Sequence, residues 1–234
     1  MPTLRVESLS KRFGKKLAVD SLDLAVNAGE VVALLGANGA GKSTTFLCLS
    51  GMMRPDGGTI RWGETLLGAN RGRSIALIPE TPEVYTLLTV WEHLVFVAKS
   101  CKLAAGWDDR ANDLLDRLNI ADQRDTLGAA LSKGMRQKTL IAATLLADAP
   151  VLLFDEPMIG LDPAGQRELR TILNELRQRE KAVVVSTHML DTAHMIADRA
   201  VVLKAGRTIF TGSFSEMQAL GTSDLESTFL AMTS

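Results

Sequence analysis

Alternating apolar and polar residues mark two segments near the N-terminus. Residues 4–7 and 22–26 place an apolar side chain at every second position, and polar turn residues separate the two segments. A period of two residues is typical of strands that bury one face. We therefore expect an antiparallel sheet in the first part of the chain.

Continuous apolar runs form a second pattern. They cover residues 31–35, 151–154 and 182–185, and the stretch 163–180 between the last two begins with a proline. Runs without alternation indicate strands buried on both faces, and proline is well tolerated in the first turn of a helix. The order strand, helix, strand predicts a parallel α/β core.

The strand patterns stop between residues 81 and 149. Residues 91–102, 109–120 and 133–148 have the apolar spacing of helices that bury one face. This spacing predicts a helical segment inserted into the core. Near the end of the chain, residues 224–233 predict one short amphipathic helix.

These patterns predict one α/β domain over residues 1–234, because a chain of 234 residues can bury a sizeable core but is short for two independent domains. We expect residues 1–80 and 150–234 to form the core, with a parallel central sheet and an antiparallel β subdomain. Residues 81–149 are expected to form an inserted α-helical subdomain.

Charge and cysteine content exclude several classes of function. Lys and Arg number 26 against 27 Asp and Glu, which gives a net charge of −1. Because this balance provides no basic field for phosphate backbones, we expect no nucleic-acid partner. Cys48 and Cys101 lie in unrelated contexts without metal-ligand spacing, so we expect both to be reduced thiols in the core.

No pattern in the sequence indicates export or membrane insertion. Residues 1–7 lack the apolar stretch of a signal peptide, and no run approaches the roughly 18 apolar residues that span a bilayer. We therefore expect a cytoplasmic protein, which would work at a membrane only through a partner there.

A glycine-rich loop at residues 36–43 satisfies the Walker A pattern G-x-x-x-x-G-K-[ST], and it lies between a predicted buried strand and a predicted helix. In such loops the backbone amides and the positive helix end bind phosphates. Lys42 is expected to bridge the β and γ phosphates, and Ser43 is expected to offer its hydroxyl to Mg²⁺. The predicted nucleotide contacts are Gly36, Asn38, Gly39, Ala40, Gly41, Lys42, Ser43 and Thr44.

Two carboxylates follow the apolar run at residues 151–154. Asp155 and Glu156 stand where ligands of α/β sheets bind, at the carboxyl end of a core strand. Asp155 is expected to hold the metal, directly or through water, and Glu156 to accept a proton from the attacking water as general base. The alternative is an ordinary solvated turn at the end of a strand.

Three further motifs stand in a recognisable order. Residues 131–138 read Leu-Ser-Lys-Gly-Met-Arg-Gln-Lys, residues 160–162 read Gly-Leu-Asp, and residues 186–188 read Ser-Thr-His. With the phosphate loop and the acidic pair, this set resembles the ABC ATPase family, in which the three motifs are the signature, the D-loop and the histidine switch. The resemblance covers nearly the whole chain.

The resemblance implies a head-to-tail dimer, either of two copies or with another ABC ATPase. In that family the signature of one subunit closes over the ATP held by the other. Ser132 and Gly134 would then contact the γ-phosphate in trans, although an ordinary helix cap is the alternative for Ser132. The resemblance also assigns Asp162 to the nucleotide site and His188 to catalysis beside Glu156 and Lys42, through a contact with the γ-phosphate. A hydrogen-bonded histidine at the end of a strand is the alternative for His188.

Two further residues, Phe13 and Glu80, are expected at the nucleotide site, and Glu80 departs from the family pattern. Phe13 lies where family members often stack an aromatic ring on adenine, and a plain core phenylalanine is the alternative. Glu80 stands where the family's Q-loop normally has glutamine. A carboxylate there can face Mg²⁺ but adds negative charge near the triphosphate, so ATP binding should depend more on the metal.

The function implied by the resemblance is that of the ATP-binding and ATP-hydrolysing subunit of an ABC transporter. Such a subunit sits on the inner face of the membrane and powers a separate permease. The signature variants, Lys133 and Met135, resemble those of an exporter branch. The apolar linker at residues 80–90 is expected to receive the permease, with subdomain core as its alternative. The rival function is an ABC ATPase that regulates a membrane or envelope process without moving a solute.

Overall fold

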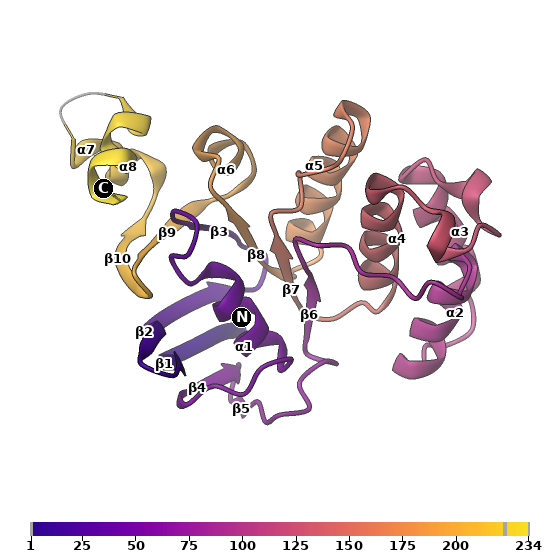
Figure 1. Cartoon of the computed structure of the whole chain (residues 1–234), viewed down its shortest axis with the longest axis horizontal. Helices are drawn as coiled ribbons and strands as arrows, with labels where there is room; N and C mark the ends of the chain where they lie inside the picture. The colour runs from indigo at the N-terminus through magenta and orange to yellow at the C-terminus, as the bar shows by residue number, and fades with distance from the viewer. Residues whose placement is uncertain (1, 222–223, 234) are drawn as a thin grey trace.

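The computed structural model describes residues 2–221 and 224–233 of the chain (Figure 1). These residues form ten strands and eight α-helices. The strands are β1 (Thr3–Phe13), β2 (Lys16–Asn27), β3 (Val31–Leu35), β4 (Gly57–Trp62), β5 (Thr65–Leu66), β6 (Ile75–Ile78), β7 (Val151–Asp155), β8 (Ala182–Thr187), β9 (Arg199–Lys204) and β10 (Arg207–Gly212). The helices are α1 (Lys42–Ser50), α2 (Val90–Cys101), α3 (Trp107–Arg117), α4 (Lys133–Leu146), α5 (Pro163–Gln178), α6 (Leu190–Ile196), α7 (Phe214–Ala219) and α8 (Leu225–Thr233), with short 3₁₀ helices η1 (Ala121–Gln123) and η2 (Gly128–Ala130).

The predicted antiparallel sheet is present and contains both predicted segments. Its strand order is β2-β1-β4-β5, and Val6 of β1 pairs with Leu24 of β2 and Ile60 of β4. These three side chains are buried and face the same apolar cluster as β3 and α1. The alternating pattern therefore gives one buried face, as expected for a half-buried sheet.

The central sheet has six strands in the order β10-β9-β3-β8-β7-β6. The three continuous apolar runs form β3, β7 and β8, which pair in parallel and are buried along their whole length. The prediction of a parallel core is confirmed, with one difference at its edge. There β10 runs antiparallel to β9, because the turn at residues 205–206 joins them directly as a hairpin.

The helices α2, α3 and α4 lie between β6 and β7 in the sequence and project at one end of the molecule, opposite α7 and α8 (Figure 1). Their apolar faces pack with α5 and the sheet in one core cluster. α3 ends at Arg117, three residues earlier than the pattern predicted. The reason is local, since Asn119 adopts a left-handed backbone with φ of 52°.

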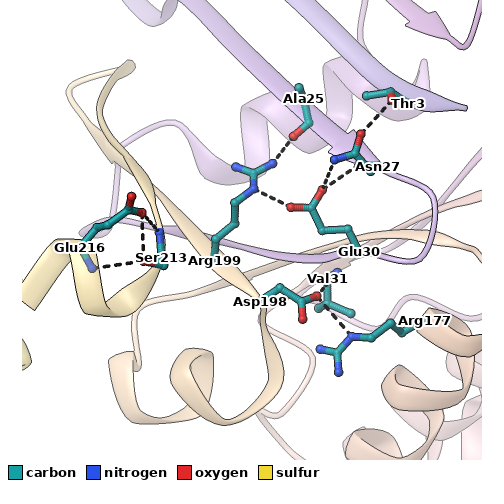
Figure 2. A network of polar contacts seen from close by, with 10 residues as sticks. All are labelled: Thr3, Ala25, Asn27, Glu30, Val31, Arg177, Asp198, Arg199, Ser213 and Glu216. Carbon is teal, nitrogen blue, oxygen red and sulfur yellow. Dashed lines mark hydrogen bonds and ion pairs between the residues drawn. The ribbon is translucent and has the colours of Figure 1, made fainter. Parts of the chain in front are cut away.

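A polar network fastens the antiparallel sheet to the central sheet (Figure 2). Arg199 at the start of β9 binds the Glu30 carboxylate and the carbonyl oxygen of Ala25 in β2. The other oxygen of Glu30 accepts hydrogen bonds from the backbone and side-chain nitrogens of Asn27, at 2.8 and 3.2 Å. The Glu30 carboxylate thus fixes the turn between β2 and β3. β3 in turn leads into the phosphate loop.

Both cysteines carry free thiols, as predicted. Cys48 is buried in α1, and burial raises the pKa of its thiol, whereas Cys101 is only partly buried at the end of α2. The expectation that both lie in the core therefore holds for Cys48 alone. Among the helices in the described residues, none combines the length and the apolar character that crossing a membrane requires.

Candidate nucleotide site

The phosphate loop connects β3 to α1, so the strand ends and the helix begins within one tight turn. Gly41 forms the N-terminal boundary of α1 with a left-handed backbone, φ of 110°. A Cβ atom at Gly41 would lie 2.5 Å from the carbonyl oxygen of Ala18 in β2, too close for any other residue. This close approach places the start of α1 beside the hairpin that carries Phe13.

Lys42 lies buried inside the loop, with its side chain 7% exposed. Its ammonium donates to the carbonyl oxygens of Gly36 at 2.7 Å and Ala37 at 3.4 Å, and lies 4.0 Å from the Glu156 carboxylate. A buried ammonium ion requires such partners. The loop therefore curls around this charge through two of its carbonyl oxygens, and glycine-rich loops that lead into a helix bind phosphate oxygens through their backbone amides.

The two carboxylates at the end of β7 are held by the neighbouring strand β8. The hydroxyl of Ser186 donates to Asp155 Oδ1, and the backbone N–H of Glu156 donates to Ser186 Oγ at 3.1 Å. Glu156 adopts a left-handed backbone, with φ of 47°, and is buried. Strain of this kind persists where the surrounding structure enforces it, and here it turns the Glu156 carboxylate toward Lys42 and His188.

His188 follows β8 and is half exposed. Its Nδ1 lies 2.9 Å from Glu156 Oε1, so the ring and the carboxylate share a hydrogen bond. Parallel pairing of β7 with β8 sets Asp155 opposite Ser186, which brings the ends of both strands to one edge of the sheet. A carboxylate, an ammonium group and an imidazole therefore lie together at this edge, a combination that suits attack of water on a phosphoryl group.

A cleft of about 580 Å³ gathers most of the predicted site. It also contains Lys16 and Ala18, which were not predicted, because both lie on the β1–β2 hairpin and belong to no motif. Gly36 and Ala40, predicted as contacts, are buried and are not among the residues that line the cleft. The predicted residues that line the cleft are Phe13, Asn38, Gly39, Gly41, Lys42, Ser43, Thr44, Glu80, Asp155, Glu156 and His188.

The signature residues lie elsewhere. Ser132, Gly134 and Asp162 line a separate cleft of about 400 Å³. Ser132 caps α4, since its Oγ accepts a hydrogen bond of 3.3 Å from the N–H of Met135. The helix cap that was the alternative interpretation of Ser132 is therefore present. Asp162 caps α5 and lies 3.8 Å from the ammonium of Lys138. One subunit therefore does not bring these three residues to its own phosphate loop.

Phe13 is not a core residue. It is 48% exposed at the end of β1 and lines the cleft. The Lys11 ammonium lies 5.7 Å from the centre of its ring and is 3.2 Å from Asp56. The N–H of Arg12 and the Lys11 ammonium hold the pKa of Asp56 below its ordinary value, so the carboxylate stays charged and fixes this strand end.

The cleft provides oxygen donors for a hard cation. Ser43 and Glu80 are exposed in it, and Asp155 lies at its base. Within residues 2–221 and 224–233, no three His, Cys, Asp or Glu side chains converge closely enough to hold a metal by themselves. The oxygen donors of Ser43, Glu80 and Asp155 fit Mg²⁺, because this hard cation prefers oxygen ligands, keeps several waters and takes phosphate oxygens as further ligands.

Comparison with known proteins places this geometry in a family. A family model described as ABC transporter matches residues 19–159. The lipopolysaccharide export system ATP-binding protein LptB of Haemophilus influenzae is 34% identical over 220 residues, 91% of each chain. The daunorubicin/doxorubicin resistance ATP-binding protein DrrA of Streptomyces peucetius is 37% identical, over 93% of this chain and 68% of that protein.

Solved structures agree with the sequence relatives. One described as the ATP-binding subunit of an ABC transporter superposes with a TM-score of 0.92 at 33% identity, over 99% of each chain. The predicted P-loop NTPase fold, with its antiparallel β subdomain and inserted helices, is thereby confirmed. The phosphate loop, the acidic strand end and the histidine meet in one cleft of a chain that belongs to the ABC transporter family, as one of its ATP-binding, ATP-hydrolysing subunits.

Proposed function

We propose that this subunit powers a separate membrane permease that works as an exporter, and that it sits on the inner face of the membrane through that permease. The observation that carries the proposal is the cleft in which Glu156 lies close to both Lys42 and His188. The direction is supported by LptB, a relative whose name describes export of lipopolysaccharide.

ATP binds along the cleft in this proposal. Phe13 stacks on the adenine, and the loop amides and Lys42 bind the phosphates. Lys16, on the strand paired with Phe13, adds a second cation to the lining. Lys42 exchanges its contacts with Gly36 and Glu156 for phosphate oxygens, because a charge-assisted bond to phosphate is stronger than one to a neutral carbonyl.

Hydrolysis follows from the position of Glu156. Water attacks the γ-phosphorus, Glu156 accepts the proton that the water loses, and the bond to the leaving ADP oxygen breaks. His188 orients the carboxylate through the 2.9 Å contact, and Lys42 stabilises the charge that develops on the phosphoryl oxygens. Ser43, Asp155 and Glu80 would hold Mg²⁺, which when bound neutralises charge on the phosphates.

A head-to-tail dimer completes the site. Ser132, Gly134 and Asp162 line a cleft apart from the phosphate loop of their own chain, so they reach a γ-phosphate only from a second subunit. At this surface the N-terminal end of α4 offers N–H groups without an acidic residue in its first turn.

The dimer is tested with two variants that both preserve the helix cap. Asp and Asn cap helices as well as Ser does, but only Asp brings negative charge. Ser132→Asp should abolish MgATP-dependent dimers in sedimentation and lower turnover at least tenfold, while Ser132→Asn retains most of both. Nucleotide affinity of the monomer should stay unchanged in each. Dimers of normal stability in Ser132→Asp would refute the assignment.

The permease is proposed to bind a docking patch, which we define as Tyr85, Leu87, Phe96 and Leu127. These side chains are 60%, 83%, 49% and 47% exposed, and the rings of Tyr85 and Phe96 lie 5.5 Å apart. The core alternative therefore does not describe Tyr85 and Leu87. Contiguous exposed apolar side chains are typical of a surface that binds another protein.

A matched pair of charge substitutions tests the patch. Tyr85→Asp should reduce recovery of the membrane partner in detergent extracts and leave ATP binding intact. Leu66→Asp is the control, because Leu66 is similarly exposed, 57%, but lies on β5 of the antiparallel sheet. Equal recovery of the partner with both variants would argue against docking at this patch.

A further inference from the structure

His93 is buried next to the docking patch and bonds the backbone through both ring nitrogens. It lies in the first turns of α2 and is 5% exposed. Nδ1 is 2.7 Å from the carbonyl oxygen of Thr89, and Nε2 is 2.9 Å from the backbone nitrogen of Tyr85. A carbonyl can only accept and a backbone N–H can only donate, so the ring is neutral with its proton on Nδ1.

This ring fixes Tyr85 in two ways. The N–H of Tyr85 donates to Nε2, and the phenol ring stacks on the imidazole with centres 5.9 Å apart. Thr89, the other partner of His93, is itself held in a capping box with Glu92. The exposed Tyr85 side chain is therefore tied to a buried, rigid helix start.

The segment at residues 85–88, which contains Tyr85, also contacts the residues just before the signature motif. The N–H of Gly128 donates to the carbonyl oxygen of Leu88 at 2.8 Å, and that of Ala129 donates to Thr86 at 3.0 Å. A Cβ atom at Gly128 would lie 2.4 Å from the carbonyl oxygen of Tyr85. Because Ser132 begins α4 three residues after Ala129, displacement of Tyr85 would also disturb the start of the signature helix.

We infer that His93 is a positioning residue, which as a neutral imidazole holds Tyr85 and the neighbouring backbone in the conformation that the permease binds. The inference rests on the proposed docking function. It also gives the docking patch a sensitivity to protons: protonated Nε2 carries a hydrogen that points at the Tyr85 N–H, so the bond is lost and the segment is released.

Charged groups around the ring decide how strongly a proton is attracted. Glu92, on the same helix, places negative charge near His93, and Tyr85 is the ionisable group stacked on it. Arg124, in the segment between α3 and α4, lies over the indole ring of Trp91, with its guanidinium carbon 3.8 Å from the ring centre. Arg136 of α4 donates a hydrogen bond of 3.5 Å to the carbonyl oxygen of Ala129 in the same segment. Each of these groups stays unchanged in the variants below.

The chain offers a direct probe, because Tyr85 is its only tyrosine. Labelling with ¹⁵N-tyrosine therefore gives a single backbone amide signal, which reports the N–H that bonds His93. Its chemical shift and its hydrogen exchange are followed in the full-length protein from about pH 7.5 to about pH 5, the range in which imidazoles change charge. Wild type should show one transition, with exchange protection falling about tenfold.

Two substitutions separate the two ring nitrogens. His93→Gln can place an amide oxygen near the position of Nε2 and accept from Tyr85, so protection and the signal position should be largely retained and become independent of pH. His93→Asn can reach Thr89 but not Tyr85, so protection should fall about tenfold at every pH. A wild-type signal in His93→Asn, or an unchanged pH transition in His93→Gln, would overturn the inference.

The test does not depend on the permease. If the amide behaves as expected but Tyr85→Asp does not affect recovery of a membrane partner, docking at the patch is wrong and the role of His93 toward Tyr85 stands. If docking is confirmed and the amide does not respond to His93, the positioning role is wrong. ATP affinity of the monomer should match wild type in both His93 variants, because His93 does not line the nucleotide cleft.

Discussion

Replacing Glu156 with glutamine removes the proposed general base and little else. Glutamine has nearly the same volume, and its oxygen can still lie 2.9 Å from His188 Nδ1. The bonds from the Glu156 backbone to Ser186 do not involve the side chain, and the left-handed backbone is as strained for one residue as for the other. The fold should therefore be unchanged.

The expected loss of turnover is two to four orders of magnitude, since a positioned base contributes roughly 10²–10⁴ to the rate. This corresponds to roughly 3–5 kcal/mol in the activation barrier. ATP binding should be retained or strengthened, because the substitution removes a negative charge 4.0 Å from Lys42, in the cleft that binds the phosphates.

The assay is phosphate release at saturating MgATP, with nucleotide affinity measured separately by equilibrium titration of a fluorescent ATP analogue. Glu64→Gln is the matched control, because Glu64 is an exposed carboxylate in the turn between β4 and β5. Glu64→Gln should hydrolyse ATP like wild type. Turnover of Glu156→Gln within about threefold of wild type, with normal binding, would refute the general-base assignment.

Three further substitutions test the adenine contact, the carboxylate in the cleft and the link between α3 and α5. Phe13→Ala should weaken ATP binding about 5-fold to 150-fold in equilibrium titrations, and Phe13→Trp should retain it, because stacking on a base contributes about 1–3 kcal/mol; equal affinities would contradict stacking. Glu80→Gln should bind ATP about threefold to tenfold more tightly than wild type in EDTA, since one negative charge is removed from the cleft, whereas an unchanged metal dependence would show that Glu80 does not face the phosphates. Arg117→Gln breaks contacts of 2.9 to 3.0 Å to Glu168 and Glu175 that join α3 to α5; unfolding should become about 1–2 kcal/mol easier, a fall in Tm of about 2–6 °C by calorimetry at low salt, and an unchanged Tm would show that this link contributes nothing.

Most of the fold could be predicted because its patterns are local. The buried runs of β3, β7 and β8 are continuous in the sequence, and the helix after Pro163 starts with the cap that Asp162 provides. The edge strand β10 was not predicted to be antiparallel, since its direction depends on a two-residue turn rather than on apolar periodicity. Boundaries set by one left-handed residue, such as Asn119, were also missed.

The candidate site likewise divides into residues that local motifs predict and residues that only the fold brings in. The phosphate loop and the acidic pair are contiguous motifs, so their placement in one cleft follows from the strand order. The participation of Lys16 depends on the hairpin that sets it opposite Phe13, and no motif marks it. His93 was read only as part of a helix, because its two bonds to backbone atoms arise from the fold of the preceding segment.

In the proposed function, ATP hydrolysis by this chain drives a membrane partner. The most direct measurement is affinity purification of the chain from native cells solubilised in mild detergent with ATP, followed by mass spectrometry of the proteins that remain bound. We expect a multi-span membrane protein in a stoichiometric ratio to the ATPase chain. Recovery of only soluble partners would contradict the transport function and leave the ATPase chemistry in place.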